Sequence, residues 1–167
     1  VITSHSEISY DYLISALGAG TNFFGVVGAA EHSFTLKNIG DAIKLKNHLI
    51  HIFDEANIEK DPERQRDILR IVVIGGGATG VELGAEIHEF LKELNKEYSH
   101  ISADAVEFYL IEADDKLLPV FHPKFSEKAF KILKNKGFKI IFKDPCAKVT
   151  EQGIFCISGQ SFKTRTV

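Results

Sequence analysis

The clearest hydrophobic pattern in the chain is a short apolar run followed at once by helical periodicity. Residues 71–74 read Ile-Val-Val-Ile and stop at a glycine turn, as a buried strand does. After the turn, apolar residues recur on one helix face: Val81, Leu83, Ile87, Phe90, Leu91 and Leu94. The pattern predicts a strand over 70–75, a helix over 78–98 and a strand over 106–112, joined as a right-handed βαβ unit.

Further elements are predicted before this unit. Residues 8–17 have the composition of a strand and end at glycine, which permits a sharp reversal. Apolar residues at helical spacing predict a helix near 37–56. The charged segment 57–66, which contains Pro62, is expected to be a solvated connection.

The chain after the βαβ unit completes the fold class. Pro123 is expected in the first turn of a helix that ends near Gly137, and a strand over 138–142 follows. The glycine-punctuated remainder predicts two or three short antiparallel strands. The elements together predict an α/β protein: a Rossmann-type three-layer fold with a mostly parallel sheet and an antiparallel β-meander. The 167 residues, 44% of them apolar, are enough for one packed domain.

The glycine turn has the spacing of a dinucleotide-binding loop. Gly75, Gly77 and Gly80 occupy the glycine positions of G-x-G-x-x-G. These glycines allow a tight turn, close approach of a pyrophosphate, and close packing of helix on strand, and Gly84 keeps that helix face thin. The motif alone is weak evidence, but the strand before it and the helix after it provide the required context. The alternative is a glycine turn that binds no nucleotide.

An acidic residue at the end of the second strand bears on the choice of cofactor. Glu112 lies 37 residues after Gly75, more than the ~20 of compact fingerprints, which fits a long helix and loop between them. A carboxylate there accepts hydrogen bonds from the adenosine ribose and repels the 2′-phosphate of NADP. No arginine lies near it in sequence. We therefore expect NADH rather than NADPH; otherwise Glu112 is a solvated carboxylate.

Glu82, two residues after Gly80, has two interpretations. It is expected in the first helical turn, where the helix dipole stabilises a carboxylate. A purely structural charge and a functional group are both consistent with that position.

Other kinds of site are not expected. His48 and His51 lie three residues apart, but no further metal ligand is near them in sequence. Cys146 and Cys156 are too far apart for a C-x-x-C pair and are expected to be structural thiols. The net charge of −3 comes from 20 basic and 23 acidic residues spread along the chain, so we expect no nucleic-acid partner and no polybasic membrane patch.

The ends of the chain predict a fragment. No apolar run approaches the ~20 residues of a membrane-spanning helix, and no signal-peptide pattern opens the sequence, so this polypeptide is expected to be soluble. The chain contains no Met and begins within a strand-like pattern. We expect a piece of a longer protein.

Three segments together resemble one protein family. They are Tyr10-Asp-Tyr-Leu-Ile-Ser-Ala-Leu-Gly18, the glycine turn from Gly75 to Glu82, and Leu110-Ile-Glu-Ala-Asp-Asp-Lys-Leu-Leu-Pro119. Their order is similar to that of the FAD-dependent pyridine nucleotide oxidoreductases, and most closely of the type II NADH dehydrogenases (NADH:quinone oxidoreductases). The resemblance covers nearly the whole chain. It implies that residues 1–35 are the trailing segment of an FAD-binding domain and a linker, and that residues 36–167 are an NADH-binding domain.

The resemblance also implies roles for particular residues. Cofactor binding is carried over to Gly75, Gly76, Gly77, Ala78, Thr79, Gly80, Glu112 and Gly18. Glu82 matches a glutamate that lies beside the nicotinamide and the flavin ring, which implies that it orients the nicotinamide or assists proton movement. The first glycine motif for FAD and the late flavin-contacting segment of the family are absent here.

The resemblance implies a function for the parent protein rather than for this chain alone. The parent would be an enzyme that passes hydride from NADH to FAD and on to a quinone, in the cytoplasm or peripherally on the inner face of the cell membrane. The chain alone would bind NADH, without FAD and without turnover. The alternatives are a ferredoxin reductase, disulfide reductase or NADH oxidase relative, or a non-catalytic dinucleotide-binding module.

Partners follow from the same resemblance. The missing FAD domain is the first expected partner, and it would pack on an apolar face around Tyr12, Leu13, Phe23 and Phe24. Without that domain, the face could make the chain a homo-oligomer.

Overall fold

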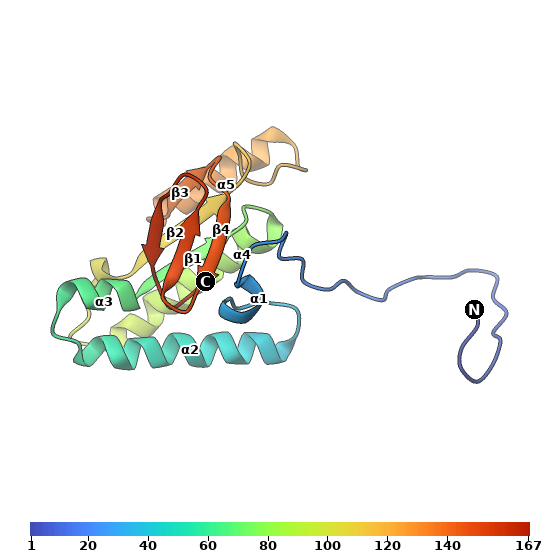
Figure 1. Cartoon of the computed structure of the whole chain (residues 1–167), viewed down its shortest axis with the longest axis horizontal. Coiled ribbons are helices and arrows are strands. Elements are labelled where there is room, and N and C mark those ends of the chain that lie inside the picture. Colours follow the sequence, from blue (N-terminus) through green and yellow to red (C-terminus); the bar gives the residue numbers. More distant parts are fainter.

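The computed structural model describes the backbone of residues 1–167 and every side chain except that of Ala103. At its centre is a parallel sheet with the strand order β1 (Arg70–Ile74), β2 (Glu107–Glu112) and β3 (Lys139–Phe142). The C-terminal residues continue this sheet beyond β1, because Ile71 forms a parallel bridge with Thr166. The sheet and its neighbours form three layers (Figure 1).

Helices cover one face of the sheet. They are α2 (Ile39–Ile58), α3 (Pro62–Ile68), α4 (Ala78–Leu94) and α5 (Pro123–Asn135). An antiparallel meander of β4 (Cys146–Thr150), β5 (Gly153–Cys156) and β6 (Ser161–Lys163) covers the other face, together with the short helix α1 (Ala29–His32). The predicted Rossmann-type fold with its antiparallel meander is confirmed.

Two apolar cores follow from the alternation of side chains along the central strands. Ile71, Val73 and Leu110 point into the larger core, which the helices complete. Val72 and Ile111 point the other way, into a smaller core that the meander completes. Because successive side chains of a strand lie on opposite faces, a continuous apolar run can supply both layers.

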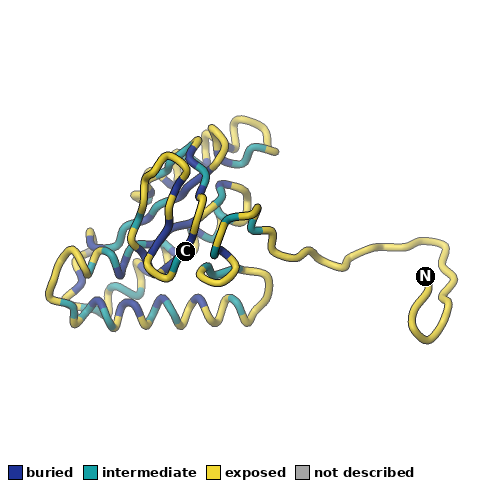
Figure 2. Tube along the Cα trace, in the orientation of Figure 1, coloured by how far each residue is buried: buried dark blue, intermediate teal, exposed yellow. Residues whose placement is uncertain are grey.

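The predicted strand over 8–17 is wrong. Residues 1–22 are all exposed and extend away from the body, so no neighbouring strand pairs with residues 8–17 (Figure 2). A strand is stable only with a partner, and none is present here. Tyr12 and Leu13 are exposed as expected, whereas Phe23 packs against the meander core.

The segment 57–66, predicted as a solvated connection, contains the start of a helix instead. Asp61 caps α3 by accepting a hydrogen bond from the Glu63 N–H at 2.9 Å, and Pro62 occupies the first turn. Both residues are typical of a helix N-terminus. The helix predicted over 78–98 ends at Leu94 and continues as one 3-10 turn, η1 (Asn95–Glu97). A separate 3-10 turn, η2 (Ala103–Ala105), lies just before β2. Nowhere in the described chain is a helix both long enough and apolar enough to cross a membrane.

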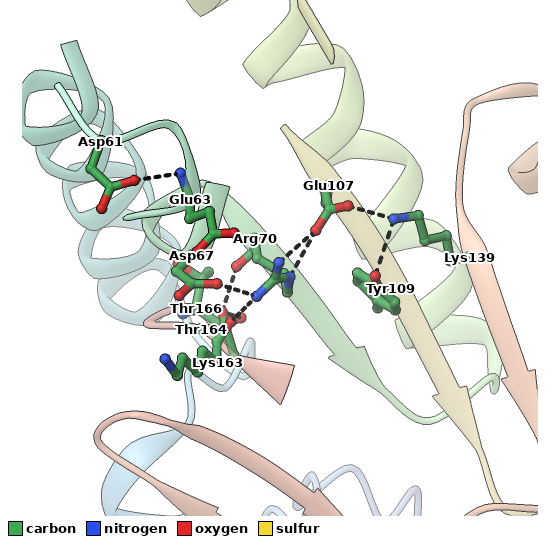
Figure 3. Close-up of polar contacts among 10 residues, drawn as sticks. All are labelled: Asp61, Glu63, Asp67, Arg70, Glu107, Tyr109, Lys139, Lys163, Thr164 and Thr166. Carbon is green, nitrogen blue, oxygen red and sulfur yellow. Dashed lines mark hydrogen bonds and ion pairs between the residues drawn. The ribbon is translucent and has the colours of Figure 1, made fainter. Parts of the chain in front are cut away.

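A row of alternating charges joins the strands at the edge of the sheet where they begin (Figure 3). Arg70 on β1 donates to Glu107 on β2 at 2.8 Å, and Lys139 on β3 donates to the other oxygen of Glu107 at 2.5 Å. Arg70 also donates to Asp67 at 2.6 Å and to the Lys163 carbonyl at 2.7 Å, which ties the meander to the sheet. Burial acts to raise the pKa of Glu107, but the hydrogen bonds that Glu107 accepts from Lys139 and Arg70 hold this pKa below its usual value.

We expect Glu107→Gln to lower the free energy of unfolding at pH 7 by about 1–2 kcal/mol, because Arg70 loses its charged acceptor in a half-buried position. The lowered pKa of Glu107 gives the sign of the pH dependence. Its contribution is complete above the usual carboxyl pKa of 4.5 and is lost as the pH falls through the lowered value, so the difference between wild type and variant should shrink in acid. Urea unfolding followed by circular dichroism measures both effects. Glu127→Gln, at an exposed site on α5, is the control; equal urea midpoints for wild type and Glu107→Gln at pH 7 would contradict the prediction.

Candidate functional site

The turn between β1 and α4 is held in a conformation that needs glycine. Gly75 has a φ of +103°, where a side chain is strained, and its N–H donates to the Ile111 carbonyl at 2.8 Å. Three residues later α4 begins at Ala78. The chain therefore reverses from strand to helix within Gly75, Gly76 and Gly77, as the motif predicted.

The third glycine position brings α4 close to β1. A Cβ on Gly80 would clash with the Gly75 carbonyl oxygen and would lie 3.4 Å from Val73. One turn later, a Cβ on Gly84 would lie 3.2 Å from the Phe138 ring. The prediction that both glycines are needed for close packing is confirmed, although a Cβ on Gly80 would meet backbone and a Cβ on Gly84 would meet a side chain.

The N-terminus of α4 is open to a ligand. Gly77 is its N-cap and supplies no side chain to accept from the first amides. The first helical hydrogen bond runs from the Val81 N–H to the Gly77 carbonyl at 3.0 Å. Gly77, Ala78 and Thr79 are exposed, and within the described structure no backbone bond uses the N–H of residues 77–80. Free amides at a helix start, with the positive end of its dipole, form a site for a phosphate group.

Glu112 lies directly beside this turn. Its side chain is 8% exposed and accepts from the Gly76 N–H at 2.5 Å through one oxygen and from the Asp114 N–H at 2.8 Å through the other. Because β1 and β2 are parallel neighbours, the end of β2 and the turn after β1 meet at the same edge of the sheet. The structure thus brings together Glu112 and the predicted glycine turn.

A loop that the sequence reasoning missed also contacts the turn. The Leu118 N–H donates to the Gly76 carbonyl at 2.8 Å, and Leu117 is 1% exposed with its side chain against Gly76. The apolar pair follows Glu112 by only a few residues, within a polar loop. That pair was the available signal, because two leucines in a loop need something to pack against.

Glu82 lies one turn deeper in the helix than predicted. The first turn of α4 contains no acidic residue, since the helix begins at Ala78, so the expected first-turn position of Glu82 is wrong. The side chain is exposed and lines a groove of about 320 Å³ between α4 and α5, together with Val81 and Leu118.

The remaining predicted site residue lies elsewhere. Gly18, with a φ of +74°, belongs to the extended N-terminal segment, and nothing lies within 4 Å of the position a Cβ would take. A separate hollow of about 1080 Å³ is lined by α2, α3, residues 31–34, the turn after β4 and C-terminal residues, and none of the predicted site residues lines it.

Comparison with known proteins identifies the family. Residues 2–167 match the pyridine nucleotide-disulphide oxidoreductases. The chain belongs to this family.

Relatives within the pyridine nucleotide-disulphide oxidoreductase family are much longer. The external alternative NADH-ubiquinone oxidoreductase of Yarrowia lipolytica mitochondria is 34% identical over 148 residues, 89% of this chain but 25% of that protein. The external alternative NAD(P)H-ubiquinone oxidoreductase B2 of Arabidopsis thaliana is 35% identical over 150 residues, 89% of this chain and 26% of that protein. The structure of NDH2 from Plasmodium falciparum in complex with NADH has a TM-score of 0.84 and 27% identity over 95% of this chain and 34% of that one. The chain spans about a quarter of the length of the curated relatives.

Gly80→Ala should disturb this family's turn more than Gly84→Ala. At Gly80 the new methyl group meets backbone, so we expect a loss of about 1–3 kcal/mol in the free energy of unfolding. At Gly84 it meets the movable ring of Phe138, and the helix gains about 0.5–1 kcal/mol from alanine, so the net change should be small. Urea unfolding of the two variants side by side is the measurement. A Gly84→Ala variant as unstable as Gly80→Ala would mean that backbone contact is not the reason for glycine.

Proposed function

We propose that this chain is the NADH-binding portion of a longer flavoprotein oxidoreductase that passes hydride from NADH to FAD and on to a quinone. The observation that carries the proposal is the open N-terminus of α4 with Glu112 at the same edge of the sheet. The names of the relatives and the NADH complex of the Plasmodium protein support it.

In this proposal, different groups bind different parts of the dinucleotide. The free amides of residues 77–80 would hold the pyrophosphate, whose negative charge the helix dipole stabilises. Each oxygen of Glu112 accepts one backbone hydrogen bond and has a further lone pair for a ribose hydroxyl. A phosphate on that ribose would meet the carboxylate, so the site favours NADH even though the Arabidopsis relative is named for NAD(P)H.

The rest of the parent protein would supply FAD, which is the hydride acceptor. We assign residues 1–35 to the trailing segment of the FAD-binding domain and linker, and residues 36–167 to the NADH-binding domain. The exposed apolar side chains of residues 1–22 support this, since Tyr12 is 93% exposed and Leu17 96% exposed. Large apolar side chains left in water indicate a surface that is meant to be covered. The chain alone would bind NADH and catalyse no turnover.

A quinone is the proposed acceptor because two relatives are named as ubiquinone oxidoreductases. The two cysteines of this chain give no support to a disulfide reductase, and a reactive cysteine pair would have to lie in the rest of the parent protein. Cys146 and Cys156 are buried in the meander core, and burial, then Asp144, raises the pKa of Cys156 to about 12. Because quinones of this kind dissolve in lipid, we propose that the parent works peripherally at a membrane surface.

Titration of the purified chain with NADH and with NADPH tests the proposal. The fluorescence of the cofactor can be followed without interference, because the chain has no Trp. We expect saturable NADH binding, NADPH binding at least about tenfold weaker, and at least about tenfold weaker NADH binding by Glu112→Ala, as the loss of hydrogen bonds to a charged group predicts. If NADH fails to bind both to this chain and to the full-length protein, the dinucleotide assignment is wrong.

Glu82→Gln in the full-length protein tests the proposed catalytic role of Glu82. We expect kcat for NADH oxidation to fall about tenfold or more while NADH affinity stays within about twofold, since the carboxylate would act on the nicotinamide rather than hold the dinucleotide. Glu86→Gln, the next exposed carboxylate on the same helix, is the matched control. An equal fall in kcat in both variants would mean that Glu82 is only a surface charge.

A further inference from the structure

Both backbone polar groups of Gly76 form hydrogen bonds with another part of the chain. Its N–H donates to Glu112 at 2.5 Å, and its carbonyl accepts from the Leu118 N–H at 2.8 Å. Both partners come from the end of β2 and the loop after it, not from the turn itself. We propose that Leu118 is a positioning residue and that Leu118, Glu112 and Leu117 together form a latch, which holds the dinucleotide turn in its binding conformation. This proposal rests on the proposed function.

The backbone of Leu118 is strained. Its φ is +51°, in the left-handed region that a bulky side chain rarely adopts. The conformation lets its N–H reach Gly76 while its carbonyl accepts from the Phe121 N–H at 2.9 Å. Strain of this kind persists only where the surroundings hold it, and such residues gather at ligand sites.

Leu117 attaches the latch to the larger core. The side chain is 1% exposed and belongs to the larger core. A Cβ on Gly76 would lie 2.6 Å from the Leu117 side chain and 2.9 Å from the Glu112 carboxylate. The middle residue of the three glycines is therefore confined by the latch, which explains why a position outside the G-x-G-x-x-G pattern is also glycine.

The latch determines which amides are left for a ligand. Because the Gly76 N–H is committed to Glu112, the donors that remain are those of residues 77–80. The Gly76 carbonyl and the Gly77 N–H belong to one planar peptide unit, so the bond to Leu118 also fixes the direction of the first amide that the pyrophosphate would meet. A site held in its bound conformation loses less conformational freedom on binding. Leu118 thus acts on affinity without touching the dinucleotide.

Leu118→Pro and Leu118→Gly separate the backbone role from the side chain. Proline has no N–H and cannot adopt a positive φ, so it removes the latch. Glycine keeps the N–H and suits the positive φ, while it removes even more of the side chain. We expect Leu118→Pro to bind NADH at least tenfold more weakly and to exchange the Gly76 amide proton at least tenfold faster by NMR. Leu118→Gly should stay within threefold of wild type in both measurements.

Two further variants test the anchor and guard against a failure of Leu118→Pro to fold. Leu117→Ala should weaken NADH binding at least fivefold, whereas Leu49→Ala, at an equally buried position on α2, should not, although both lower stability. Unchanged NADH binding in Leu117→Ala, or in a folded Leu118→Pro, overturns the latch. If NADH binds neither to the wild-type chain nor to the full-length protein, the proposed function fails, and the exchange rate of the Gly76 amide alone decides whether the latch exists.

Discussion

The close approach of α4 to β1 is the constraint on which the rest of the site depends. It is possible only because Gly80 has no side chain to meet the Gly75 carbonyl oxygen. The approach brings the start of α4 to the edge of the sheet where β1 and β2 end, and leaves its first amides without a capping side chain. The same packing that completes the helical core therefore also creates a site for a negative charge at this edge.

The sheet separates stability from binding. Arg70, Glu107 and Lys139 join the three strands at the edge where the strands begin, and Arg70 extends the network to the meander. The glycine turn and Glu112 lie at the opposite edge, where the strands end. Buried apolar side chains on both faces of β1 connect the two edges. Substitutions at the starting edge should thus change the free energy of unfolding without acting on the ligand, whereas those at the ending edge should act on ligand binding as well.

Sequence reasoning predicted the elements whose signals are local. The apolar run 71–74, the glycine spacing and the helical periodicity after it describe one continuous stretch of chain, and the structure confirms that stretch almost residue by residue. The strand over 8–17 could not be judged in this way, because its composition reports a preference for pairing but not the presence of a partner. Asp61 and Pro62 indicate the start of α3, but the charged residues around them favoured the prediction of a solvated connection.

The contacts of the site were less predictable than its residues. Glu112 is predicted from the sequence as the ribose-binding acid at the end of the second strand, but the pattern does not predict its hydrogen bond with the Gly76 N–H. Nothing in the spacing of Leu117 and Leu118 specifies that this loop folds back onto the glycines.

The Glu112 carboxylate therefore has two roles. It must accept from the Gly76 and Asp114 amides to shape the turn, and in the proposed function it must also accept from the ribose. Glutamine at this position could satisfy one amide through its single carbonyl oxygen but would present hydrogen-bond donors to the other, so it would be a poor replacement for glutamate even without a charged ligand. The carboxylate thus shapes the turn and, in the proposed function, also determines the choice of cofactor. The two backbone hydrogen bonds explain why an acidic side chain can be buried here at 8% exposure without a basic partner among the described side chains.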